Sequence, residues 1–105
     1  MSWTATPRVD EDLITGRDFI AADNTRAAVA FLDTAFETFD AIGSYPNMGT
    51  PARFRHPALR RLRFVVLPHP FNRWLVFYQA RPRAATIVRV LYGAVNWRQE
   101  PGRFF

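Results

Sequence analysis

The two halves of the chain differ in charge and in the spacing of their apolar residues. Residues 1–52 contain three arginines and eight acidic residues, a balance of −5, whereas residues 53–105 contain eleven arginines and one acid, a balance of +10. Apolar residues recur at helical spacing in the first half, while the second half holds three short β-type runs, at 62–67, 74–78 and 86–91. The sequence therefore predicts an acidic helical layer beside a basic sheet, one face of which meets a polyanion or an acidic partner.

The acidic half predicts two helices joined by a short bend. Thr6 is expected to be the N-cap of the first helix, with Pro7 at the first helical position. The buried stripe of this helix is predicted to be Val9, Leu13, Gly16 and Ile20. Because glycine has no side chain, Gly16 should allow another element to approach this helix closely.

The Asp23-Asn24 pair is predicted to end the first helix and to cap the second, which should run from Thr25 and end at Gly43. Its buried stripe is predicted to be Ala28, Leu32, Ala35, Phe36, Phe39 and Ile42. The bend between the two helices is short, so they should form an antiparallel hairpin.

The predicted fold is α+β and occupies residues 1–105 as one domain. An N-terminal strand near Trp3 precedes the helical hairpin at about 7–43, a loop at 44–61, a three-stranded antiparallel sheet at about 62–92 and a tail at 93–105. The sheet should pack on the hairpin, with the N-terminal strand joining its edge. Of two alternating sets in the strands, one must face the helices: Leu62, Phe64 and Val66, or Trp74, Val76 and Tyr78.

Composition excludes several classes of site. The chain has no cysteine, so it can form neither a disulfide nor a zinc–thiolate site. Its two histidines have no clustered acids nearby, and we expect no metal site and no cofactor. The apolar runs are too short to cross a bilayer and the N-terminus lacks a signal pattern, which favours a cytoplasmic protein with no membrane partner. All 14 basic residues are arginine, a bidentate donor for carboxylate or phosphate.

Short motifs occur in a consistent order along residues 3–96. They are Pro7-Arg8 with Asp12-Leu13, Ile20-Ala21-Ala22-Asp23-Asn24, Ala28 with Phe31-Leu32-Asp33, Tyr45-Pro46-Asn47-Met48-Gly49, Leu59-Arg60, Tyr78, and Val88-Arg89-Val90-Leu91-Tyr92-Gly93-Ala94. In this order and spacing the chain resembles the ParE branch of the RelE/ParE toxin superfamily. Where many ParE-like chains read Leu-His-Gly-Ala-Arg-Asp, this chain has Tyr92, Val95 and Asn96 in place of the His, Arg and Asp.

The resemblance implies the toxin of a bacterial type II toxin–antitoxin pair. Such a toxin is held inactive by a ParD-like antitoxin and inhibits DNA gyrase without chemistry of its own. RelE-like relatives share the fold and cleave mRNA on the ribosome, which is the alternative function. A non-toxic homologue, retained for its antitoxin-binding surface, is a third interpretation.

Candidate antitoxin contacts follow from apolar residues outside the two stripes and from the arginines: Ile14, Val29, Phe31, Arg63, Arg73 and Arg89. The apolar members either form a groove for an amphipathic antitoxin helix or widen the buried face. Arg89 lies inside an apolar strand, with Ile87 and Leu91 expected on its face. It either pairs with an acid on a helix or waits for an antitoxin carboxylate.

Candidate contacts to the target lie in the tail: Trp97, Arg98, Phe104 and Phe105. The sequence leaves open whether the aromatic members fold back on the sheet or contact another chain.

For the nuclease alternative the candidate residues are Tyr92, Arg89, Arg63 and Arg61, which would supply a hydroxyl and cations for phosphorane charge. His56 and His69 are interpreted as exposed turn residues. No carboxylate lies between Arg53 and Gln99 to accept a proton, so a protein without catalytic residues is favoured. Direct nucleic-acid binding, through arginines interleaved with aromatic residues, is less favoured than a protein partner.

Overall fold

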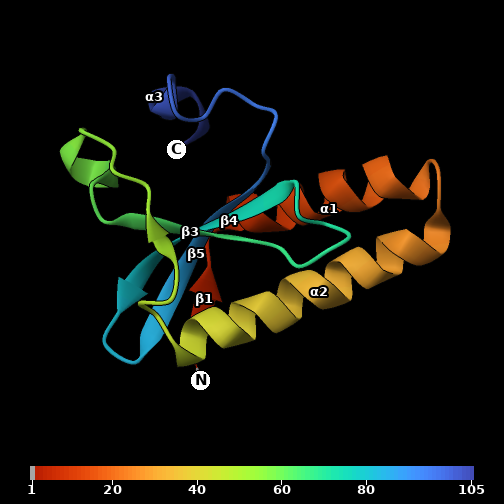
Figure 1. The fold of residues 1–105 in the computed structure, drawn as a ribbon, viewed down its shortest axis with the longest axis horizontal. Helices are drawn as coiled ribbons and strands as arrows, with labels where there is room; N and C mark the ends of the chain where they lie inside the picture. Colours follow the sequence, from red (N-terminus) through yellow and green to blue (C-terminus); the bar gives the residue numbers. More distant parts are fainter. Residues whose placement is uncertain (1) are drawn as a thin grey trace.

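The computed structural model describes residues 2–105, in which two helices pack on one five-stranded sheet. The helices are α1 (Pro7–Ala21) and α2 (Thr25–Ser44), and a short α3 (Pro101–Phe104) ends the chain (Figure 1). The strands are β1 (Trp3–Ala5), β2 (Thr50–Pro51), β3 (Leu62–Val66), β4 (Trp74–Arg81) and β5 (Ala84–Tyr92). Their order in the sheet is β1-β5-β4-β3-β2.

This α+β architecture confirms the predicted hairpin and antiparallel meander, but the predicted strand count was incomplete. β1 joins the edge of the sheet as expected, parallel to β5. The predicted loop at 44–61 contains a further strand, β2, which pairs antiparallel with β3, and a 3-10 turn at Pro57–Leu59. A strand of two residues that includes a proline has no periodicity by which a sequence could indicate it. Within residues 2–105, no helix is both long and apolar enough to cross a membrane.

The N-cap side chain bonds to a backbone N–H of its own helix in α2 but not in α1. Of the predicted capping pair Asp23-Asn24, Asn24 caps α2, since its side chain accepts a hydrogen bond from the Ala27 N–H at 3.0 Å. Thr6 occupies the N-cap position of α1, but its hydroxyl donates to the Val88 carbonyl at 3.0 Å instead. The Thr6 N–H also bonds to the Ile87 carbonyl. Thr6 therefore fixes the start of α1 to the edge of β5.

Two glycines allow close packing inside the helices. A Cβ on Gly16 would lie 2.8 Å from the Phe31 ring, which confirms the predicted close approach. Gly43 was predicted to end α2 and does not, because α2 continues to Ser44. A Cβ at Gly43 would lie 2.7 Å from the Ser2 carbonyl oxygen, so this glycine makes room for the N-terminal segment.

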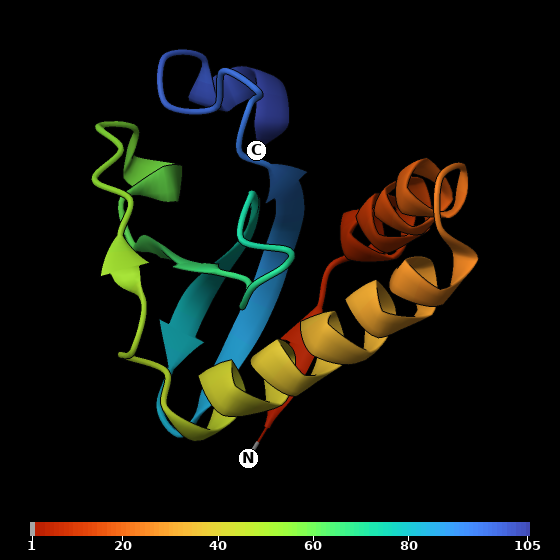
Figure 2. The ribbon, with the colours of Figure 1, turned by 45° about the vertical axis from the view of Figure 1, so that its right-hand side comes forward.

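Both faces of the sheet are covered by apolar side chains. The set Trp74, Val76 and Tyr78 faces α1 and α2, as one of the two predicted alternatives required. The opposite face carries Leu62, Leu75, Phe77 and Leu91, and is covered by the tail and by the segment around Phe54. Figure 2 shows the helical hairpin on one side of the sheet and α3 at one end of it.

A bulge in β5 changes the face of one predicted residue. Phe77 pairs with Arg89 and Tyr78 with Ile87, so Val88 is the extra residue. Ile87 consequently packs in the helix-facing core, while Leu91 packs on the opposite face. The expectation that both share the face of Arg89 is therefore wrong for Ile87.

Tyr78 anchors the turn that follows α2. Its hydroxyl donates to the Pro46 carbonyl at 2.7 Å and accepts from the Gly49 N–H at 2.9 Å. The side chain is fully buried. Burial raises the pKa of Tyr78, and the Gly49 N–H and Arg63 oppose this shift to a smaller extent.

Replacing Tyr78 by Phe is expected to lower the free energy of unfolding by about 1–3 kcal/mol, because it leaves two backbone groups without a partner. In the wild type the pKa of Tyr78 is higher when folded than the value of about 10 when unfolded. The protonated Tyr78 hydroxyl therefore contributes fully to the free energy of unfolding below pH about 10. This contribution is lost as the pH rises through the pKa of Tyr78 in the folded protein. Urea denaturation from neutral to alkaline pH measures both effects.

The matched control for this experiment is Tyr45→Phe, at an exposed tyrosine next to the same turn. It should leave both the stability and its alkaline pH dependence unchanged. Equal behaviour of the two variants would contradict the role assigned to Tyr78.

Candidate partner-binding surface

A groove between α1 and α2 exposes apolar side chains on the outer side of the hairpin. Its volume is about 370 Å³, and its walls are Asp10, Leu13, Ile14, Arg17, Leu32 and Phe36. Ile14 is 49% exposed and Phe36 is 44% exposed, although both are large and apolar. Exposed apolar side chains that converge in a groove are typical of a protein-binding site.

Val29 extends this surface along α2. It is 57% exposed, and Val29, Leu32 and Phe36 follow one another at the i, i+3, i+7 spacing of one helix face. An amphipathic helix of a partner uses the same spacing to fit such a groove. Phe36 was assigned to the buried stripe, and its exposure became visible only from the packing of α2 on the sheet.

Phe31 lies elsewhere. It is fully buried and packs against the rings of Phe71 and Trp74, with centroid distances of 5.6 and 5.0 Å. The expectation that Phe31 lies outside the buried stripe is therefore wrong. Its ring fills the space that Gly16 leaves between α1 and α2.

A second groove lies on the other side of α2, against β3. It has a volume of about 300 Å³ and includes Met48 and Val66, which are about half exposed. β2 pairs only with Arg63 and Phe64, so among the described residues no strand lies beside the outer edge of β3 beyond Phe64. Met48 and Val66 were named in the sequence as parts of a motif and of a strand face, but neither was predicted to contact a partner, because the groove arises from how α2 crosses the sheet.

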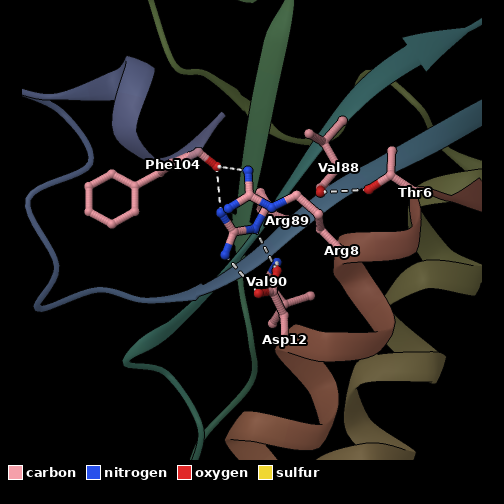
Figure 3. Close-up of polar contacts among 7 residues, drawn as sticks. All are labelled: Thr6, Arg8, Asp12, Val88, Arg89, Val90 and Phe104. Carbon is pink, nitrogen blue, oxygen red and sulfur yellow. Dashed lines mark hydrogen bonds and ion pairs between the residues drawn. The ribbon is translucent and has the colours of Figure 1, made fainter.

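Arg89 forms a bidentate ion pair with Asp12 of α1. Its Nε and Nη2 donate to the two carboxylate oxygens at 2.8 and 2.7 Å, and each side chain is 10% exposed (Figure 3). The same carboxylate accepts the Val90 N–H at 2.9 Å. Asp12 thus accepts a backbone hydrogen bond from β5 at a position beyond the part of β5 that pairs with β1. Of the two alternatives for Arg89, the structure contains the pair with a helix acid.

The remaining Nη1 of Arg89 donates to the carbonyl of Phe104 in α3, and Arg8 also donates to this carbonyl at 3.4 Å (Figure 3). All three nitrogens of the Arg89 guanidinium therefore have partners within the chain. The two arginines attach the tail to α1 and β5.

Arg63 and Arg73 occupy different ends of the sheet. Arg63 is half-buried and donates to the Gly49 carbonyl at 2.7 Å, which supports the turn that Tyr78 anchors. Arg73 is exposed at the other end, and its Nη1 lies 3.5 Å from the Tyr92 hydroxyl. This hydroxyl raises the pKa of Arg73.

The candidate nuclease residues do not converge in the part of the chain that the structure describes. Tyr92 pairs with Trp74 in the sheet and contacts its ring at 5.2 Å. Arg63 pairs with Tyr78, four residues further along the same strand, and Arg61 lies just before β3. Arg89 is held by Asp12. The Tyr92 hydroxyl therefore has only Arg73 as a cationic neighbour among its hydrogen-bond partners in residues 2–105.

The tail folds back on the sheet. Trp97 is buried between Phe77, Phe64 and Phe54, at ring distances of 4.9, 5.6 and 5.9 Å. Phe105 contacts Phe54 and Phe77, and Phe104 packs at the border of the same cluster. Arg98 remains exposed and lies over the Trp97 ring at 4.4 Å. Of the aromatic tail residues, Phe104 and Phe105 keep some exposed surface.

The family model described as "ParE toxin of type II toxin-antitoxin system, parDE" matches residues 4–97. None of the curated proteins matches the chain. A similar solved structure is titled "Chromosomal ParDE TA system from P. aeruginosa". It is 16% identical, its TM-score is 0.65, and the match covers 86% of this chain and 92% of that one.

Proposed function

The chain belongs to the family of ParE toxins of type II toxin–antitoxin systems, and from this premise we propose that it inhibits DNA gyrase and is neutralised by a ParD-like antitoxin. The observation that carries the antitoxin part is the exposed apolar groove between α1 and α2. Ile14, Phe36 and Val29 form the contact surface for an amphipathic antitoxin helix.

The second groove supports an extended continuation of the antitoxin chain. Beyond Phe64, the outer edge of β3 has no neighbouring strand within residues 2–105 and lies beside the apolar side chains of Met48 and Val66. An extended segment that pairs there gains main-chain hydrogen bonds and side-chain burial at the same time. Phe31 and Arg89, which are buried and packed or paired within the toxin, act from behind this surface by fixing α2 and β5.

Charge favours the encounter with an acidic segment. The balance of +10 in residues 53–105 is concentrated on the sheet and its loops, where Arg73 stays exposed. Attraction of this kind accelerates association and weakens as salt screens it. The association rate with the antitoxin should therefore fall as ionic strength rises, while dissociation from the apolar groove changes less.

For gyrase inhibition the support is the family, together with a tail that leaves Arg98 and parts of Phe104 and Phe105 exposed at one end of the sheet. These residues, with Trp97 as the buried anchor beneath them, are the proposed target contacts. The scattered positions of Tyr92, Arg61 and Arg63 give the mRNA-cleaving alternative no comparable geometric support.

Purified protein is expected to inhibit the supercoiling of relaxed plasmid DNA by purified gyrase, and equimolar antitoxin should restore supercoiling. The parallel assay adds the protein to translating ribosomes and maps the ends of the mRNA. Tyr92→Phe should leave gyrase inhibition intact. Undisturbed supercoiling together with new mRNA ends, abolished by Tyr92→Phe, would replace the proposed function by the nuclease.

A further inference from the structure

A further hollow, separate from the groove between α1 and α2 and from the groove between α2 and β3, lies between the segment after β2 and the tail. It has a volume of about 310 Å³ and is lined by residues 52–56 on one side and by Arg98, Gln99 and Pro101 on the other. Figure 2 shows the segment between β2 and β3 and α3 at the same end of the molecule, away from the turn between β4 and β5. Two stretches more than 40 residues apart in sequence therefore build one site.

Buried aromatic contacts and a backbone hydrogen bond hold the two walls of this hollow on the sheet. Phe54 and Trp97 are both buried and contact each other edge to face at 5.9 Å. The Ala52 N–H donates to the Leu62 carbonyl, which ties the first wall to β3. Between these anchors Arg53 adopts a φ of 63°, a left-handed conformation that a residue with a side chain rarely adopts. The surrounding packing therefore holds the loop in one shape.

Three arginines are among the donors that line the hollow. Arg53, Arg55 and Arg98 are exposed, and none of them forms an ion pair with a described residue. The nearest acid in sequence, Glu100, pairs with Arg103 instead. Nδ1 of His56 accepts the Ala58 N–H at 3.1 Å, so the ring proton of the neutral imidazole lies on Nε2, as a further donor.

The surroundings of the hollow select the chemistry of its ligand. A folding peptide needs apolar anchors, but the large exposed apolar residues of the described chain are Ile14, Phe19, Val29, Phe36, Tyr45, Met48 and Val66. None of them belongs to the walls of this hollow. A polyanion that binds through its charge needs no such anchor. Guanidinium groups and the Gln99 amide match the non-bridging oxygens of phosphodiesters.

We propose that this hollow binds the phosphodiester backbone of a nucleic acid. Arg55 and Arg98, one on each wall, contact successive phosphates, and Arg53, His56 and Gln99 supply further donors. Contacts of this kind hold a backbone without reading its sequence. This activity is independent of the antitoxin groove, and it shares only Arg98 with the proposed gyrase contacts.

The test is fluorescence anisotropy with labelled oligonucleotides of about 16 nucleotides, as single-stranded RNA, single-stranded DNA and duplex DNA of one sequence. The hollow variant carries Arg55→Gln and Arg98→Gln. The matched control is Arg81→Gln with Arg83→Gln, which removes the same charge from exposed arginines at the β4–β5 turn. Circular dichroism checks that both variants are folded.

The hollow variant should lose at least about tenfold in affinity for the oligonucleotides, and the control variant less than about threefold. In the hollow variant the slope of log K for oligonucleotide binding against log salt should fall in magnitude by about 2, since two phosphate contacts are removed. The three oligonucleotides then rank RNA against DNA as the natural source of the backbone.

Equal losses in both variants would show that binding follows net charge alone, and would overturn the proposal. So would the absence of binding at about 50 mM salt. A labelled polyglutamate peptide of the same length forms the last arm. If the hollow variant loses affinity for this peptide while it binds nucleic acid normally, the hollow binds an acidic peptide and the proposal is wrong.

Discussion

Replacing Asp12 by Ala is expected to lower the free energy of unfolding by about 3–5 kcal/mol, which is the usual cost of breaking a buried ion pair from one side. The variant leaves the Arg89 guanidinium without its bidentate partner at a site where only 10% of the side chain is exposed. The Val90 N–H loses its acceptor as well. A domain of this size has about 5–15 kcal/mol in total, so much of the stability would be lost. Urea denaturation followed by circular dichroism measures the change.

Two further variants separate the pair from a general effect of charge. Asp18→Ala removes the acid of the Arg17–Asp18 pair, which is 45% and 64% exposed, and should cost less than about 1 kcal/mol. Asp12→Leu combined with Arg89→Met replaces both buried charges by apolar groups and should recover part of the loss. A cost for Asp12→Ala no greater than that for Asp18→Ala would contradict the assigned role of this pair.

Replacing Ile14 by Asp is expected to weaken antitoxin binding by about 30- to 1,000-fold, equivalent to about 2–4 kcal/mol at an interface hot spot. The substitution places a carboxylate in the middle of the apolar groove, opposite Leu32 and Phe36 and close to Asp10. Calorimetric titration of the toxin with its antitoxin gives the affinity. In cells, the variant should stay toxic when the antitoxin is co-expressed.

The matched control is Phe19→Asp, on the same helix. Phe19 is more exposed than Ile14. It lies next to Tyr92 and outside the groove between α1 and α2. This variant adds the same charge to α1 and should keep the affinity for the antitoxin within about threefold. If both variants weaken binding equally, the partner does not occupy the groove between α1 and α2.

The sequence predicted the parts of this fold that depend on local periodicity. Helical spacing in residues 7–43 and alternation in the strands indicated the hairpin and the meander. Gly16 indicated a close approach of another element, which the structure shows to be Phe31 of α2. β2 was missed, because two residues carry no pattern and pair only through Arg63 and Phe64. The bulge at Val88 was missed too, since it depends on how β5 pairs with β4.

Burial on α2 could be predicted only in part. Phe31 and Phe36 are both apolar and lie five positions apart, and the pattern alone assigned the wrong one to the interior. The choice depends on the position of Trp74 and Phe71, which come from a distant part of the chain. The same is true of Arg89, whose partner Asp12 lies 77 residues earlier in the sequence. The tail contacts of Trp97 likewise depend on Phe54 and Phe77.

The most direct test of gyrase as the target is induced expression in a bacterial host that lacks the antitoxin. Colony counts, the DNA damage response and the integrity of translated mRNA are read in the same culture. We expect growth arrest with an induced damage response and intact transcripts, relieved when the antitoxin is supplied. Arrest with fresh cuts in translated mRNA and no damage response would contradict it, and so would normal growth.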